Sequence, residues 1–174
     1  RELVNGIKIN TDKKILEDFQ KSAGFDYTKD QKRSIKEIFA DLSSGRVMDR
    51  LLSGDVGFGK TEVAMNAMLA VILDGFQAIF VCPTTLLATQ HYHSMQKRFS
   101  EFGISIAKLD GKTSAKEKTH IKKGLASGEI KLVIGTHSLL EIQTDNLALV
   151  IIDEEHKFKD KQKEKLKHLR EDVH

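Results

Sequence analysis

The chain has 174 residues and a mass of 19.6 kDa, enough for one self-sufficient hydrophobic core, so we expect a single globular unit. Hydrophobic residues make up 40% and charged residues 30% of the sequence, a balance that argues against a disordered chain. The single cysteine, Cys82, excludes an internal disulfide and a cysteine-rich zinc site, and we expect it to be a small buried residue. No apolar run is long enough to span a membrane, and the first ten residues, RELVNGIKIN, lack the apolar core of a signal peptide, which predicts a cytoplasmic protein without a membrane partner.

The net charge is only +3, but lysines concentrate in residues 110–124 and 157–170. Runs of this kind are solvated helix faces or they face a nucleic acid or another phosphate-rich partner. Composition leaves both interpretations open.

Residues 1–24 mix short apolar clusters with polar stretches and are interpreted as a lead-in connector, in which Asn10 to Asp12 could cap a short helix. From Thr28 apolar residues recur at helical spacing, up to an expected helix end near residues 43–45. Strands are predicted at residues 46–53, 77–82, 104–109, 131–136 and 147–152. Helices are predicted at residues 60–74, 85–102, 114–127, 138–142 and 159–170, the third with a capping box formed by Ser114 and Glu117.

This alternation of strands and helices predicts an α/β domain with a doubly wound, mostly parallel sheet and helices on both faces. In such sheets ligands bind at the carboxyl ends of the strands. The loops that follow the strands are therefore the expected positions of ligand-binding and catalytic residues.

The loop after the first predicted strand reads GDVGFGKT and matches the phosphate-binding pattern G-x-x-x-x-G-K-[ST]. Its glycines let the backbone approach a polyphosphate, Lys60 supplies a positive charge, and the Thr61 hydroxyl can ligate magnesium. The alternative is a plain glycine-rich turn, but a strand before and a helix after the pattern favour ATP and Mg²⁺ as cofactors. The predicted nucleotide-binding residues here are Gly54, Asp55, Val56, Gly57, Phe58, Gly59, Lys60, Thr61 and Glu62.

The last predicted strand ends in DEEH, residues 153–156. A phosphate-binding loop needs a carboxylate from another strand, and we expect Asp153 to share magnesium with Thr61 while Glu154 orients or deprotonates the attacking water. His156 is expected to sense the phosphate site, which gives Lys60, Asp153, Glu154 and His156 as catalytic candidates. The alternative is that these acids merely close a buried strand.

The two loops together resemble the D-E-x-H helicases and translocases of superfamily 2. MDRLLSGDVGFGKTEVAM, VCPTTLLATQHY, VIGTHSLL, LVIIDEEHKF and QKEKLKHLR are similar to the first RecA-like motor lobe of the bacterial transcription-repair coupling factors, a resemblance that covers about residues 25–170. The resemblance implies that Gln31 reads adenine with Phe25 close by, although Thr28 and Gln31 also fit a capping box. It implies DNA-backbone contacts in PTTLLATQH (Pro83 to His91) and in GTH (Gly135 to His137), for which helix capping by Thr85 and by Thr136 or Ser138 is the alternative. The implied DNA-binding residues are Thr84, Thr85, Gln90, Thr136 and His137.

The resemblance implies an ATP hydrolase that moves along double-stranded DNA, displaces stalled RNA polymerase and engages an excision-repair damage-recognition protein through domains absent here. The lobe is expected at residues 25–174, ending before the motif that couples hydrolysis to movement, and it should be nearly inactive without the arginine fingers of a second lobe. LDGKTSAKEK is nearer to a branch-migrating, fork-reversing DNA helicase of the same superfamily, which is the alternative. An NTP-dependent protein remodeller or regulatory module also stays open.

Overall fold

The computed structural model of the chain describes residues 7–45, 58–142 and 144–153. Within these ranges a parallel sheet of four strands has the order β2-β3-β1-β4. The strands are β1 (Gln77–Val81), β2 (Ile106–Leu109), β3 (Leu132–Gly135) and β4 (Leu147–Ile152). Each matches a predicted strand to within two residues, and the predicted doubly wound α/β class is confirmed. The strand predicted at 46–53 and the helix predicted at 159–170 lie outside the described residues.

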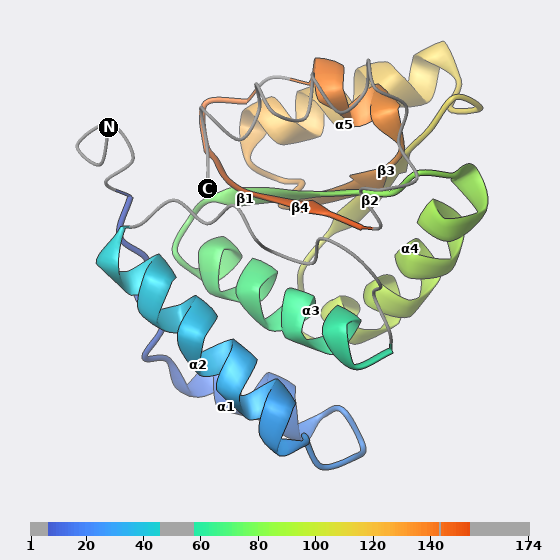
Figure 1. Cartoon of the computed structure of the whole chain (residues 1–174). Coiled ribbons are helices and arrows are strands. Elements are labelled where there is room, and N and C mark those ends of the chain that lie inside the picture. Colours follow the sequence, from blue (N-terminus) through green and yellow to red (C-terminus); the bar gives the residue numbers. More distant parts are fainter. Residues whose placement is uncertain (1–6, 46–57, 143, 154–174) are drawn as a thin grey trace.

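Helices cover both faces of the sheet (Figure 1). On one face lie α3 (Phe58–Leu73) and α4 (Thr85–Ser100), and on the other lie α5 (Ala115–Ser127) and the short 3₁₀ helix η1 (His137–Glu141). The outer helices α1 (Lys14–Lys21) and α2 (Lys29–Ser44) pack on α3, away from the sheet. Because α3 has the sheet on one side and these helices on the other, residues 62–72 are all buried.

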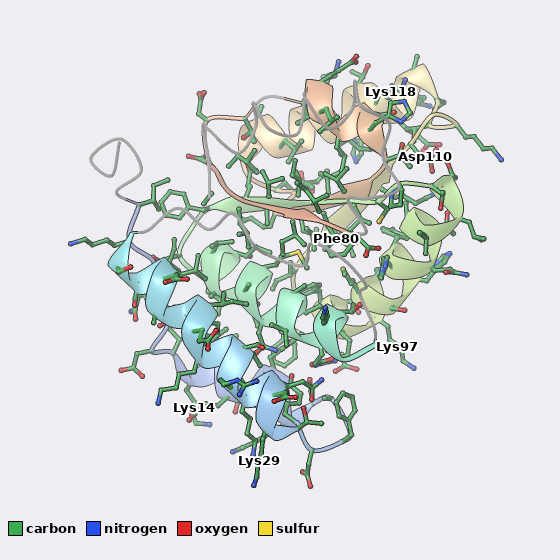
Figure 2. The ribbon with its side chains drawn as sticks, viewed as in Figure 1. Lys14, Lys29, Phe80, Lys97, Asp110 and Lys118 are labelled. Atoms are coloured by element: carbon green, nitrogen blue, oxygen red, sulfur yellow. The ribbon has the colours of Figure 1, made fainter. Side chains whose placement is uncertain are left out.

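The strand residues divide between two hydrophobic cores according to the alternation of side chains along a strand. Ala78 and Phe80 face the core shared with α3, whereas Ile79 and Val81 face the core under α5. Figure 2 shows Phe80 between the sheet and α3. Buried strands of this kind read as continuous apolar runs, which explains why the sequence located them well.

Local signals account for most helix ends. Thr28 and Gln31 form the expected capping box, and α2 ends at Gly45, whose φ of 79° is the left-handed conformation that glycine adopts without strain. Ser114 Oγ accepts a hydrogen bond from the Glu117 backbone N–H at 3.1 Å, which confirms the predicted start of α5.

The predicted cap of α1 is wrong. Asn10 Oδ1 accepts a hydrogen bond from the backbone N–H of Asp12 at 3.0 Å, and α1 begins after Lys13 without a side-chain cap. The segment is held instead by tertiary contacts with the end of α3, because Lys13 Nζ donates to Leu73 O at 3.0 Å and to Asp74 Oδ1 at 3.1 Å. The described part of the predicted connector therefore packs into the same hydrophobic core as α3.

The carboxyl ends of the strands place four polar or reactive residues along one edge of the sheet. Cys82, Asp110, Thr136 and Asp153 directly follow β1, β2, β3 and β4 (Gly135 ends β3), and all four are buried. Backbone hydrogen bonds fix this edge, since Asp153 N–H donates to Val81 O at 2.9 Å and Cys82 N–H to Gly135 O at 2.7 Å. This is the edge where a doubly wound sheet binds its ligand.

Candidate functional site

A pocket of about 640 Å³ opens beside this edge, between the first turn of α3 and the inner face of α4. It brings together Thr61 from the predicted phosphate-binding loop and Asp153 from the predicted acidic motif. The described residues that line it also include Glu62, Gln90, His91 and Arg98. Two sequence motifs separated by about ninety residues therefore meet in one place, as the phosphate-binding interpretation requires.

Asp153 is 1% exposed, and one of its two carboxylate oxygens has a hydrogen-bond partner among the described residues. Its Oδ2 lies 3.0 Å from His91 Nε2, on the middle of α4. Because an ionised carboxylate only accepts hydrogen bonds, this pairing assigns the ring hydrogen to Nε2. The ring of His91 packs against Phe80 with the centroids 5.0 Å apart, so both the position and the direction of the donor are fixed.

The other oxygen of Asp153, Oδ1, is buried and has no hydrogen-bond partner among the described residues. A buried carboxylate oxygen is costly to leave without a partner, so this atom marks a place where a ligand fits. Cys82, His91 and Asp153 bring one ligand atom each within 4.8 Å of one another. Magnesium prefers oxygen ligands, and of these three side chains only Asp153 suits it.

The described part of the phosphate-binding loop begins α3. Lys60 is exposed, Thr61 lies on the pocket wall, and Gly59 is covered by Gln31, whose Nε2 donates to Gly59 O at 3.2 Å. A Cβ at Gly59 would lie 3.1 Å from that nitrogen, so the close approach favours glycine. Gly54 to Gly57 and the side chain of Phe58 lie outside the described residues, as do Glu154 and His156, and their roles stay predictions.

Gln31 is 8% exposed and holds two elements together. Its Oε1 accepts from Thr28 N–H at 2.8 Å while its Nε2 donates to Gly59 O in the predicted phosphate-binding loop. Among the hydrogen bonds of the described residues, one lone pair of Oε1 and one hydrogen of Nε2 are unused, which is the pattern that an adenine base needs. Phe25 is 39% exposed and lines both the main pocket and a second one of about 610 Å³, so both predicted adenine residues lie near the phosphate-binding loop.

Glu62, predicted to contact the nucleotide, is engaged by the protein. Arg98 Nη1 donates to Glu62 Oε1 at 2.6 Å, and the Tyr27 hydroxyl donates to Oε2. Asn66 Nδ2 donates to Tyr27 Oη at 3.1 Å, and Arg98 Nη2 donates to Phe19 O at 3.0 Å. This network, Tyr27–Glu62–Asn66–Arg98, ties the N-terminal segment to α3 and α4.

The surroundings favour the neutral phenol of Tyr27 and the charged guanidinium of Arg98. Burial and the hydrogen bond to Glu62 raise the pKa of Tyr27 to about 12. Burial works against the charge of Arg98, but its hydrogen bond and ion pair with Glu62 outweigh burial and raise the pKa of the guanidinium above its ordinary value. Sequence reasoning missed this network, although an acid inside the apolar helix after Thr61 was a signal that a buried partner was needed.

The predicted DNA-binding residues lie on two elements. Thr84 is the N-cap of α4, with its Oγ1 accepting from Leu87 N–H at 3.2 Å, so the capping role expected of Thr85 belongs to Thr84. Gln90 and His137 are exposed, whereas Thr136 is 4% exposed. Thr136 makes no side-chain cap, and its Oγ1 has no partner among the described residues, so the capping alternative fails there. His91 faces Asp153, a contact that the sequence did not reveal.

Gly135, in the second predicted DNA motif, has a structural requirement of its own. A Cβ at this position would lie 1.8 Å from the backbone oxygen of Leu109 on the neighbouring strand. Glycine at Gly135 therefore follows from the close contact of β2 and β3, whatever the loop binds.

Comparisons with known proteins agree with this arrangement. Residues 28–174 match the DEAD/DEAH box helicase family. The whole chain is 52% identical to a transcription-repair-coupling factor of Helicobacter pylori, covering 17% of that protein, which confirms the resemblance carried by the motifs. It is 48% identical over 168 residues to the ATP-dependent DNA helicase RecG of Thermotoga maritima, covering 95% of this chain and 22% of that one. A structure of RecG bound to a three-way DNA junction superposes with a TM-score of 0.82 at 47% identity, over 91% of this chain and 22% of that one. The chain thus spans about a fifth of the length of these relatives.

Proposed function

This chain belongs to the DEAD/DEAH box helicase family, and we propose that it forms the ATP-binding lobe of an ATP-dependent translocase on double-stranded DNA. The observation that carries the proposal is Asp153, a buried carboxylate on the wall of the pocket that Thr61 also lines, with one oxygen that has no hydrogen-bond partner among the described residues. High identity to coupling factors supports the finer proposal that the intact protein displaces stalled RNA polymerase and recruits excision repair. Those partners would be reached through other parts of the intact protein.

The residues divide the work of ATP hydrolysis between them. Lys60 would hold the outer phosphates, Thr61 and Asp153 would hold magnesium, and Glu154 would take a proton from the attacking water. Bound magnesium would neutralise the charge that develops on the phosphates. Phe25 and the free hydrogen-bonding capacity of Gln31 would receive the adenine ring. We expect slow hydrolysis by this chain alone, because the arginine finger that speeds such reactions would be supplied by a second lobe.

The nucleotide half of the proposal is tested by calorimetry with the non-hydrolysable analogue AMP-PNP and Mg²⁺. Lys60→Ala should weaken binding at least tenfold, because the lysine charge faces the β- and γ-phosphates. Lys122→Ala is the matched control, an exposed lysine on α5, on the opposite face of the sheet. Unchanged affinity in Lys60→Ala would remove the phosphate-binding assignment.

The DNA half is tested by the salt dependence of duplex binding by the intact protein. A backbone-binding motor should lose affinity steeply as salt rises, and replacing Thr84 and Thr85 with alanine should lower the affinity of every DNA sequence alike. For a protein remodeller or a regulatory module built on this lobe, we expect no such loss of DNA affinity with rising salt.

A second candidate is the branch-migrating, fork-reversing helicase. The identity to RecG and the superposition on the junction-bound RecG structure favour this function nearly as strongly as the identity to the coupling factor favours the first. A preference of the intact protein for branched DNA over linear duplex, without any effect on a stalled RNA polymerase, would select this function over the coupling factor.

A further inference from the structure

His91 belongs to a segment whose resemblance points to DNA, yet its side chain faces the ATP site. It lies in α4, seven residues after the N-cap Thr84, and its side chain is 17% exposed. Its Nε2 is 3.0 Å from Asp153 Oδ2, while Gln90, the residue before it, is exposed. Both residues line the pocket, but of the two only His91 contacts the predicted magnesium ligand.

The geometry of the contact constrains the carboxylate as well as the histidine. Oδ2 is occupied by His91, and the backbone N–H of Asp153 is fixed to Val81 O at 2.9 Å. Rotation of the carboxylate would break a charge-assisted hydrogen bond inside the protein. Oδ1 is thus kept as the one carboxylate oxygen without a partner among the described residues, on the pocket that Thr61 also lines.

The histidine is itself held in place. Its ring packs on Phe80, which is fully buried between the sheet and α3 (Figure 2). A donor held on a rigid helix and braced by a buried aromatic ring has little freedom to leave the carboxylate. This is the arrangement by which outer groups orient the ligands of a metal.

We propose that His91 is a positioning residue of the ATP site, which holds Asp153 Oδ2 so that Oδ1 is presented to the magnesium of bound MgATP. The inference rests on the proposed nucleotide-binding function and extends it to a residue in a segment otherwise expected to bind DNA. It assigns His91 no contact with substrate and no exchange of protons. Its consequence is a higher affinity for the metal-bound than for the metal-free nucleotide.

The test compares AMP-PNP binding in EDTA and in Mg²⁺, measured by calorimetry on the whole 174-residue chain. His91→Phe keeps a ring against Phe80 but removes the donor, whereas His91→Gln keeps an N–H donor at about the same reach. Magnesium should raise the affinity for AMP-PNP about tenfold less in His91→Phe than in the unaltered chain. A loss of this size is usual when a group that orients a metal ligand is removed. His91→Gln should restore most of the affinity that magnesium adds, and binding in EDTA should be the same in all three proteins.

His93→Phe is the matched control, because His93 is an exposed histidine two residues further along α4. If His91→Phe keeps the full magnesium effect, or loses affinity equally in EDTA and in Mg²⁺, the positioning role is wrong while the nucleotide site stands. If the unaltered chain binds no AMP-PNP in either condition, the proposed function fails and the inference with it.

A measurement on the unaltered chain covers the case in which His91→Phe does not fold. Nitrogen NMR of the labelled imidazole should find the hydrogen of His91 on Nε2 both before and after Mg²⁺ and AMP-PNP are added. A switch of that hydrogen to Nδ1 on binding would show that His91 releases Asp153, and would overturn the proposal.

Discussion

Asp110 and Asp153 occupy equivalent places in the fold but differ in how their oxygens are used. Each directly follows a strand of the same sheet, and each is 1% exposed. Asp110 Oδ1 accepts from Lys112 N–H at 2.8 Å, and its Oδ2 accepts from Lys108 Nζ at 3.1 Å. Asp110 is labelled in Figure 2. Asp153 has a partner for Oδ2 alone among the described residues.

The difference distinguishes an acid whose two oxygens are paired within the protein from the acid that we propose as a magnesium ligand. Burial works to raise the pKa of Asp110, but its hydrogen bonds from Lys112 and Lys108 outweigh burial and hold that pKa below the ordinary value. Asp110 therefore stabilises the loop after β2 by its own contacts. Asp153 Oδ1 has no partner among the described residues and could bind a cation. The Tyr27–Glu62–Asn66–Arg98 network resembles Asp110, because both oxygens of Glu62 are paired.

The largest expected effect is on stability, at Arg98. Arg98→Met should lower the free energy of unfolding by about 3–5 kcal/mol, because it leaves the 3%-exposed Glu62 side chain charged and without its cation. Urea unfolding measures this loss. Arg33→Met removes the exposed ion pair with Asp30 and should cost no more than about 1 kcal/mol. A loss equally small in Arg98→Met would show that the network does not hold the lobe together.

The second prediction compares one substitution at the two aspartates. Asp110→Asn should cost about 1–3 kcal/mol of stability, because it weakens hydrogen bonds that involve a charge, and should leave magnesium-dependent AMP-PNP binding intact. Asp153→Asn should cost less stability and remove the affinity that magnesium adds. Urea unfolding and calorimetry on both variants test this, and equal effects of the two on both properties would break the comparison.

The third prediction concerns pH and has the smallest effect. The pKa of Tyr27 is about 12 in the folded chain and about 10 in an unfolded one, so the folded state binds the phenolic proton more tightly. Its contribution to stability is complete below pH 10 and is lost as the pH rises towards 12. The melting temperature of the unaltered chain should therefore fall more steeply over this range than that of Tyr27→Phe, and parallel curves would contradict the prediction.

The sequence predicted the fold because its signals are local and consistent with one another. Four buried apolar runs, the capping box at Thr28 and the glycine that ends α2 each specify a short segment, and together they determine the alternation. The cap at Asn10 failed because that segment is held by Lys13 and Asp74, residues far apart in sequence. Contacts between residues so far apart in sequence produce no periodic pattern of residue types from which they could be predicted.

The site was predictable as two motifs but not as a set of contacts. Thr61 and Asp153 were predicted to share a site from the residue types that phosphate and magnesium require, and the structure places both on one pocket. The pairing of His91 with Asp153 and that of Arg98 with Glu62 depend on how α4 is rotated against the sheet and α3. This rotation follows from packing of the whole core, which residue spacing within one helix does not specify.

The structure of this chain with AMP-PNP and Mg²⁺ bound is the most direct test of the central claim that the pocket is an ATP site built on Thr61 and Asp153. We predict the triphosphate at Gly54 to Thr61, with Asp153 Oδ1 directed to magnesium and Oδ2 still paired with His91 Nε2. Nucleotide bound elsewhere, or both Asp153 oxygens turned to protein partners with the pocket empty, would contradict it.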